Sequence, residues 1–208
     1  MLRRTLAVVT ALLVPSGLLV ATSSSDAWAL IGGQGIANCQ IFSGHGTVSP
    51  GLTPAGSASG VKIHFTAMLD SAAAGGCPNS NVTVPAGDTI IGGKVTGSGF
   101  YNGVNADACS NFNGPDVVGK IVVTIKWTMS GAPIAPTRIV YTSNPGTVTG
   151  APFDIITLSA PPGSATKTGS FVAPPTLNTV QLKTDLPGPG CPPGPTSTFN
   201  VTGGNVLV

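Results

Sequence analysis

The sequence predicts an all-β protein: an antiparallel β-sandwich, Ig-like or Greek-key in style, of about nine or ten short strands, with a barrel as the alternative. Three observations predict it. Apolar and polar residues alternate over short runs, which is the period of a half-buried strand. The 208 residues include 29 glycines and 19 prolines, and these separate the runs as turns would. Only 8% of the residues are charged and none is glutamate, so strong helix formers are scarce.

The N-terminal segment has the pattern of a secretory signal peptide. Arg3 and Arg4 form a positive start, and Leu6 to Ala21 is almost entirely apolar. Ala27 and Ala29 then supply the small residues of an A-x-A cleavage site. We therefore expect a cleaved N-terminal signal helix with the cut after Ala29.

This cut divides the chain into a signal peptide, 1–29, and a single secreted β domain, 30–208. The alternative is a membrane anchor that is retained. A spanning helix needs about 20 apolar residues, and Pro15 and Gly17 interrupt this run. No later stretch approaches spanning length, so we expect no transmembrane segment in the mature chain, which is secreted, either extracellular or in the cell envelope.

The first predicted strand is Ile36–Phe42, and a connection rich in Gly, Ser and Pro follows it at Ser43–Gly60. Val61–Leu69 alternates cleanly between apolar and polar residues, as a half-buried antiparallel strand does. Thr89–Val95 continues the pattern, and its glycine pair, Gly92-Gly93, predicts a bulge or a close backbone approach.

The strongest predicted strand is Lys120–Met129. Its apolar residues at every second position, ending with Trp127, should face the core, with polar residues on the other face. The remaining predicted strands are Arg138–Thr142, Phe153–Leu158, Thr168–Val172, Thr179–Thr184 and Thr198–Val208.

The chain contains 4 cysteines, Cys39, Cys77, Cys109 and Cys191. An even number in an exported protein predicts two disulfides. No C-x-x-C spacing occurs, so the competing metal site is not favoured and no metal ligand is assigned. Among the possible connectivities we favour Cys39–Cys77 and Cys109–Cys191, because elements that follow each other in the chain tend to be neighbours in space.

The segment Cys39–Thr53, CQIFSGHGTVSPGLT, carries a family resemblance. It resembles the mature N-terminus of small secreted β-rich proteins of high-GC Gram-positive bacteria, with Gln40 and Ile41 standing between Cys39 and Phe42. The resemblance covers about the first third of the mature chain. It implies an exported, β-rich domain of bacterial origin and brings no catalytic residue with it.

Charge gives little indication of a partner. The formal net charge is +2, and after residue 29 the charged residues are scattered singly along the chain. The sequence therefore shows no basic footprint for nucleic acid or anionic lipid, and no nucleic-acid partner is expected.

The two histidines, His45 and His64, are the candidates for acid–base chemistry. No Gly-x-Ser-x-Gly elbow accompanies them. His64 falls on the polar face of its strand, and His45 is flanked by glycines. We therefore assign no catalytic residue and no cofactor, and expect a protein that is not an enzyme.

An oxygen-rich segment at 102–116 is a candidate calcium loop. Calcium takes six to eight oxygen ligands, but the terminal Glu of an EF-hand is missing here. A turn region beside Cys109 is the favoured interpretation. The oxygen donors are Asn102, Asn105, Asp107, Asn111, Asn113 and Asp116.

The best candidate for a contact site is the aromatic pair Phe100 and Tyr101. Adjacent residues of a strand point to opposite faces, so one of the two rings should be exposed. Aromatic side chains supply large contact areas for ligands.

The sequence as a whole favours a non-catalytic, binding or structural protein of the cell envelope or the extracellular space. Its partner would be an envelope or extracellular protein or a glycan. The alternatives are an exported hydrolase that uses a histidine and an envelope pore or assembly subunit.

Overall fold

The protein is described by a computed structural model that covers residues 33–70, 77, 81–84, 88–109, 118–142, 146–149, 155–159, 165–174, 176–186 and 194–208. These residues form strands and no helix. The strands are β1 (Gln34–Ile36), β2 (Asn38–Leu52), β3 (Gly60–Leu69), β4 (Asn81–Thr83), β5 (Ile90–Asn102), β6 (Val118–Met129), β7 (Thr137–Thr142), β8 (Gly146–Thr149), β9 (Ile155–Leu158), β10 (Ala165–Thr168), β11 (Thr179–Thr184) and β12 (Thr196–Leu207).

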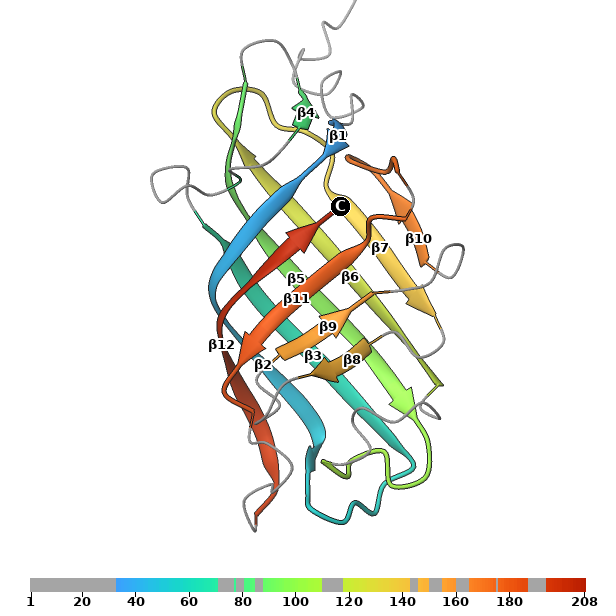
Figure 1. Cartoon of the computed structure of the whole chain (residues 1–208). Coiled ribbons are helices and arrows are strands. Elements are labelled where there is room, and N and C mark those ends of the chain that lie inside the picture. Colours follow the sequence, from blue (N-terminus) through green and yellow to red (C-terminus); the bar gives the residue numbers. More distant parts are fainter. Residues whose placement is uncertain are drawn as a thin grey trace, which may run out of the picture.

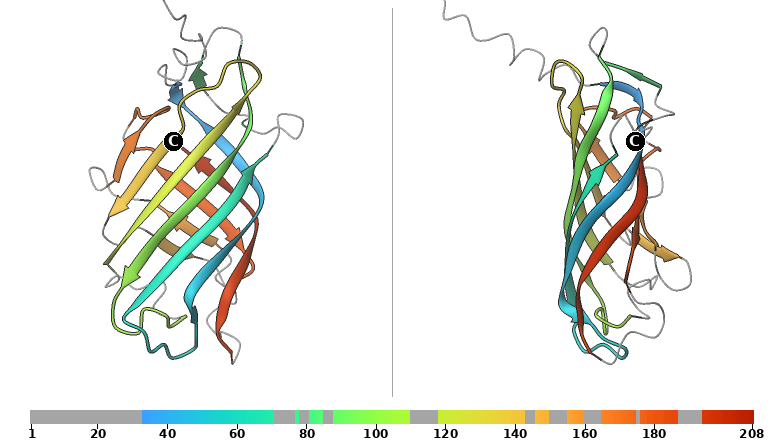
Figure 2. Two further views of the ribbon diagram at one scale, coloured as in Figure 1. Left: turned by 180° about the vertical axis from the view of Figure 1, so that it is seen from behind. Right: turned by 90° about the vertical axis from the view of Figure 1, so that its left-hand side faces the viewer.

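One antiparallel sheet contains ten of these strands, in the order β10-β7-β6-β5-β3-β2-β12-β11-β9-β8. The early strand β2 and the last strand β12 pair in its middle. The sheet curls, so β11, β9 and β8 lie across from β3, β5 and β6 (Figures 1 and 2). The predicted all-β fold is confirmed, and a single continuous sheet supplies both layers. A separate two-stranded sheet pairs β1 with β4.

The space between the two layers is filled by the inward side chains of the alternating strands. Phe65 of β3, Ile125 of β6 and Leu182 of β11 belong to one buried cluster. Trp127 is part of that cluster, as its position in the alternating pattern predicts. Burial of these side chains from both layers is the main source of stability.

Glycines on the inward face make room for two phenylalanine rings. Across neighbouring strands the register runs Phe199, Gly46, Phe65, Gly97, so large and absent side chains alternate. A Cβ at Gly46 would collide with the ring of Phe199, and one at Gly97 with the ring of Phe65. The rings cover the glycine backbone, which is a known way of building a curved sheet.

Several predicted strands match closely. Val61–Leu69, Lys120–Met129 and Thr179–Thr184 correspond to β3, β6 and β11. Two others are much longer than predicted, because β2 continues to Leu52 and β5 to Asn102. Gly44 and Gly46, which contributed to the predicted connection after Phe42, lie in β2. A Cβ at Gly44 would collide with the backbone of Thr66 and Ala67, and one at Gly46 with the ring of Phe199. The short strands β1, β4 and β8 were not predicted.

The predicted strand Thr168–Val172 is wrong beyond its first residue. β10 ends at Thr168, and Gly169 and Phe171 have positive φ values of 92° and 55°. The chain turns inward there, because Phe171 is fully buried edge-on against Trp127, with ring centroids 4.9 Å apart. The Phe171 N–H also donates to the Gly33 carbonyl at 2.7 Å.

The predicted disulfide Cys39–Cys77 is present, with Cα atoms 4.1 Å apart. Cys109 is buried, but Cys191 lies outside the described residues, as does the predicted signal peptide with its cut after Ala29. None of the described residues forms a helix that could cross a membrane.

Candidate functional site

The alternation of β5 places Phe100 and Tyr101 on opposite faces of the sheet. Phe100 is 44% exposed on the outward face, whereas Tyr101 is 4% exposed and belongs to the buried cluster. Burial raises the pKa of the Tyr101 hydroxyl well above its ordinary value. Of the predicted contact pair, only Phe100 is therefore available to a ligand, because the pleat turns Tyr101 inward.

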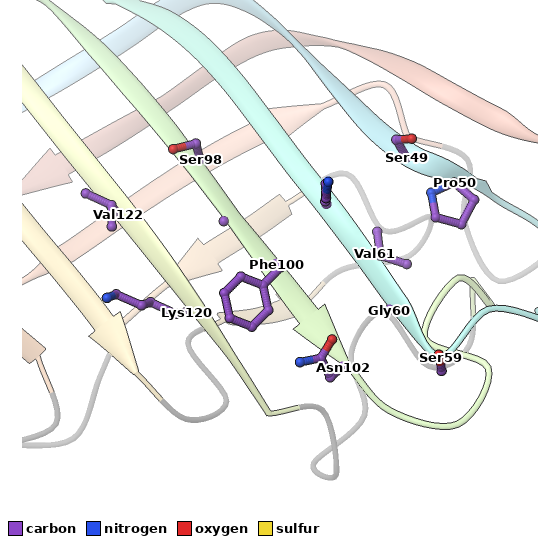
Figure 3. Close-up of a pocket in the computed structure, with 12 residues that line it drawn as sticks. Ser49, Pro50, Ser59, Gly60, Val61, Ser98, Phe100, Asn102, Lys120 and Val122 are labelled. Atoms are coloured by element: carbon purple, nitrogen blue, oxygen red, sulfur yellow. The ribbon is translucent and has the colours of Figure 1, made fainter.

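Phe100 borders an open hollow of about 770 Å³ on the outward face of β2, β3, β5 and β6. Figure 3 shows the Phe100 ring between Asn102 at the end of β5 and Lys120 on β6. Ser49 and Pro50 of β2 form the opposite side. We call this space the Phe100 hollow.

Two lysines flank the ring in the strand register. Phe100 is the Cα partner of Lys62 on β3 and of Lys120 on β6. Both lysines are exposed and line the Phe100 hollow. Neighbouring strands lie about 4.8 Å apart, so the two lysine backbones are about 10 Å apart with the ring between them. The arrangement offers an apolar stacking surface with an ammonium group on either side.

Hydrogen-bonding groups complete the lining. The Ser98 hydroxyl and the Asn102 amide lie along β5 beside Phe100. These groups, with the ammonium groups, suit a ligand that has an apolar face and several oxygen atoms at its edge.

The wall of the hollow at Ser59 is held by Asp107 from the loop after β5. The Asp107 carboxylate accepts hydrogen bonds from the N–H groups of Ser57 and Ala58 at 2.6 and 2.7 Å. Burial raises the pKa of Asp107, but the N–H groups of Ala58 and Ser57 outweigh this and hold it below its usual value. The Asp107 carboxylate thus has a structural role. Residues 110–116 of the candidate calcium segment lie outside the described residues.

The two histidines both lie exposed on the outward face, within the strands. His64 is the Cα partner of Thr47 on β2 and of Ser98 on β5, and His45 is the partner of Thr66 on β3. Strands β2, β3 and β5 contain no aspartate or glutamate. The register therefore brings a histidine beside a serine without a carboxylate from these strands to orient the imidazole. In the described part of the chain, no group of three or more His, Cys, Asp or Glu could hold a metal ion.

Sequence reasoning missed Lys62 and Lys120. Alternation indicated that both lie on polar strand faces, but the sequence did not show that β3 and β6 flank β5. Two charges that are distant in the chain are therefore brought together in space. The signal that could have found them is the lysine at an outward position near one end of each predicted strand.

No protein-family model, curated protein or solved structure matches this chain. The resemblance to secreted proteins of high-GC Gram-positive bacteria stays a prediction.

Proposed function

We propose that this chain is an exported, non-catalytic binding protein that holds a carbohydrate in the Phe100 hollow. The observation that carries the proposal is a large aromatic ring, 44% exposed, between Lys62 and Lys120. An aromatic face packs against the apolar face of a sugar ring, while amide, hydroxyl and ammonium groups bind its oxygens. A carbohydrate has both features.

The register supports binding more than the hydrolase alternative. His64 stands opposite Ser98, but its own strand and the two beside it lack a carboxylate. A hydrolytic triad requires such a group to set the tautomer of the histidine.

The experiment is affinity electrophoresis of the purified protein through gels that contain one polysaccharide each. The panel contains neutral dextran and galactan and acidic polygalacturonate and hyaluronate. At least one member should retard the protein. Replacement Phe100→Ala should weaken that interaction about tenfold, because the stacking surface at the centre of the site is lost.

The matched control is Phe42→Ala, which removes another exposed phenylalanine, 56% exposed, outside the Phe100 hollow. It should leave retardation unchanged. Absence of retardation by every polysaccharide, or equal retardation of Phe100→Ala and the unchanged protein, would overturn the proposal.

A further inference from the structure

The outward face carries a group of exposed cations that begins at the Phe100 hollow and continues along the sheet. Lys62 lies on β3, Lys94 on β5, Lys120 and Lys126 on β6, and Arg138 on β7. These four strands are consecutive neighbours in the sheet. We call the outward side chains of β3, β5, β6 and β7 the cationic strip.

The cationic strip has no carboxylate within its strands. The sequences of β3, β5, β6 and β7 contain neither aspartate nor glutamate, and the same holds for β2 beside them. Of the described aspartates, Asp70 directly follows β3, and Asp88, Asp107 and Asp185 lie outside strands. The positive charges therefore have no neutralising partner from the strands that carry them.

Two of the cations repel each other directly. Lys94 and Lys126 are Cα partners on β5 and β6, and both side chains are exposed. Like charges that stand directly opposite each other destabilise a sheet. An anion that sits between the two ammonium groups would convert this repulsion into attraction.

The strip has the dimensions of a polymer site. Lys126 is six positions after Lys120 along β6, which corresponds to about 20 Å of extended strand. Between these two ends, Thr66, Thr96 and Thr124 form a row across three strands that ends beside Arg138. Along β5, Ser98 and Thr96 stand on the outward face between Phe100 and Lys94, so hydroxyl groups link the Phe100 hollow to the Lys94–Lys126 pair, and the threonine row crosses this path.

The exposed apolar side chains on the strip do not form one patch. Met68 stands beside Lys94, about 20 Å along the sheet from Phe100. Insertion into a lipid surface needs apolar groups that act together, and stacking of nucleic-acid bases uses several aromatic rings. A hydroxyl-lined, positively charged track with one exposed phenylalanine ring suits an acidic polysaccharide better.

We infer that the ligand is an acidic polysaccharide, whose chain stacks one sugar on Phe100 and extends along the cationic strip to Lys94 and Lys126. The inference rests on the proposed carbohydrate-binding function and adds the charge and the path of the ligand. The carboxylates of the polymer pair with the lysines and Arg138, and its hydroxyl groups lie over the threonine row.

The test measures binding of the full chain to polygalacturonate by biolayer interferometry, at low and at high salt. Binding should weaken steeply as salt screens the charges. Lys126→Gln should reduce affinity on the order of fivefold at low salt, and Lys94→Gln/Lys126→Gln should reduce it further. Lys183→Gln, which removes an exposed lysine from β11 on the other layer, is the control of equal net charge and should change affinity less than about twofold.

The outcomes separate the inference from the proposed function. Binding of neutral galactan that requires Phe100 but not Lys126 would overturn the inference and leave the proposed function standing. Binding to phosphatidylglycerol vesicles or to DNA, without binding to any polysaccharide of the panel, would overturn both. Equal losses of affinity in Lys126→Gln and Lys183→Gln would show that the effect depends on net charge alone and would overturn the assigned path. Far-ultraviolet circular dichroism of each variant verifies that it is folded.

Discussion

The two ends of β6 each combine an aromatic ring with a lysine. At one end the protein itself covers the ring and accepts the hydrogen bonds of the lysine, and at the other end both are exposed. At one end, Trp127 packs edge-on against the fully buried Phe171. Its indole N–H donates to the Thr137 hydroxyl at 2.9 Å, and that hydroxyl donates to the Ser170 carbonyl at 2.6 Å.

The lysine at this end is held in the same way. The Lys167 ammonium donates to the carbonyls of Phe171, Pro174 and Leu177 at 3.1, 3.0 and 2.6 Å.

At the other end, about 23 Å along the strand from Trp127, Lys120 and Phe100 are exposed. An aromatic ring and a lysine are again present, but among the described residues no aromatic ring packs against Phe100 as Phe171 packs against Trp127. The difference shows that an aromatic ring and a lysine stabilise the fold where the protein packs against the ring and accepts the hydrogen bonds of the lysine. Where it leaves them exposed, they are available to a ligand.

The largest expected effect on the free energy of unfolding is at the Trp127 end of β6. Trp127→Ala should lower the free energy of unfolding by about 3–5 kcal/mol, because it removes a buried ring and leaves a cavity beside Phe171. Equilibrium denaturation with the Cys39–Cys77 disulfide intact measures this change. Phe100→Ala is the comparison and should cost less than about 1 kcal/mol. Equal losses in the two variants would contradict the distinction between the two ends.

A smaller effect is expected at the wall of the Phe100 hollow. Asp107→Asn should cost about 1.5–3 kcal/mol at neutral pH, because the charged acceptor of two backbone N–H groups is lost. The pKa of Asp107 is lowered in the folded state, so its contribution is present above the ordinary value of 3.8 and is lost as the pH falls through the folded value. Denaturation at pH 7 and pH 3 should show the difference between variant and unchanged protein shrinking in acid. A difference that is constant with pH would rule out the charged role.

The third prediction compares two lysines. Lys167→Met should lower the free energy of unfolding by about 1–2 kcal/mol, because three carbonyl groups lose their donor. Lys120→Met, at the exposed end, should change it by no more than about 0.5 kcal/mol. Thermal melts of both variants test this order, and a reversed order would show that the Lys167 contacts contribute no stability.

The smallest expected effect has the opposite sign. Lys94→Gln should raise the free energy of unfolding by about 0.2–0.5 kcal/mol at low salt, because it removes the repulsion with Lys126. The gain should vanish in high salt, where the repulsion is screened. Lys183→Gln, whose Cα partners are Gly203 and Ile155, should show no comparable gain. A loss of stability in Lys94→Gln would mean that Lys94 has a favourable partner.

Sequence reasoning predicted the parts of the fold that depend on local pattern. The alternation in Val61–Leu69 and Lys120–Met129 specified both the strands and their buried faces. Gly44 and Gly46, by contrast, predicted a loop. Whether such a glycine lies in a turn or in a strand depends on contacts with distant residues. Gly46 lies under the ring of Phe199, and Gly44 lies against the backbone of Thr66 and Ala67. The predicted strand Thr168–Val172 was wrong at Phe171 for the same reason, because the burial of Phe171 against Trp127 is a contact between distant segments.

The candidate site, too, was predicted only as far as it depends on local pattern. That one of Phe100 and Tyr101 would be exposed followed from the pleat alone. Which one faces outward was decided by the packing of the two layers, which buries Tyr101.

The sequence by itself determined the all-β class, because its apolar residues recur every second position and its chain lacks helix formers. It also provided the cysteines, of which Cys39 and Cys77 are joined. Only the tertiary structure decided which strands are neighbours. Strand order comes from long-range packing and has no local signature in the chain. That order places Lys62 and Lys120 on either side of Phe100 and Lys94 opposite Lys126, and so turns singly scattered charges into one cationic strip.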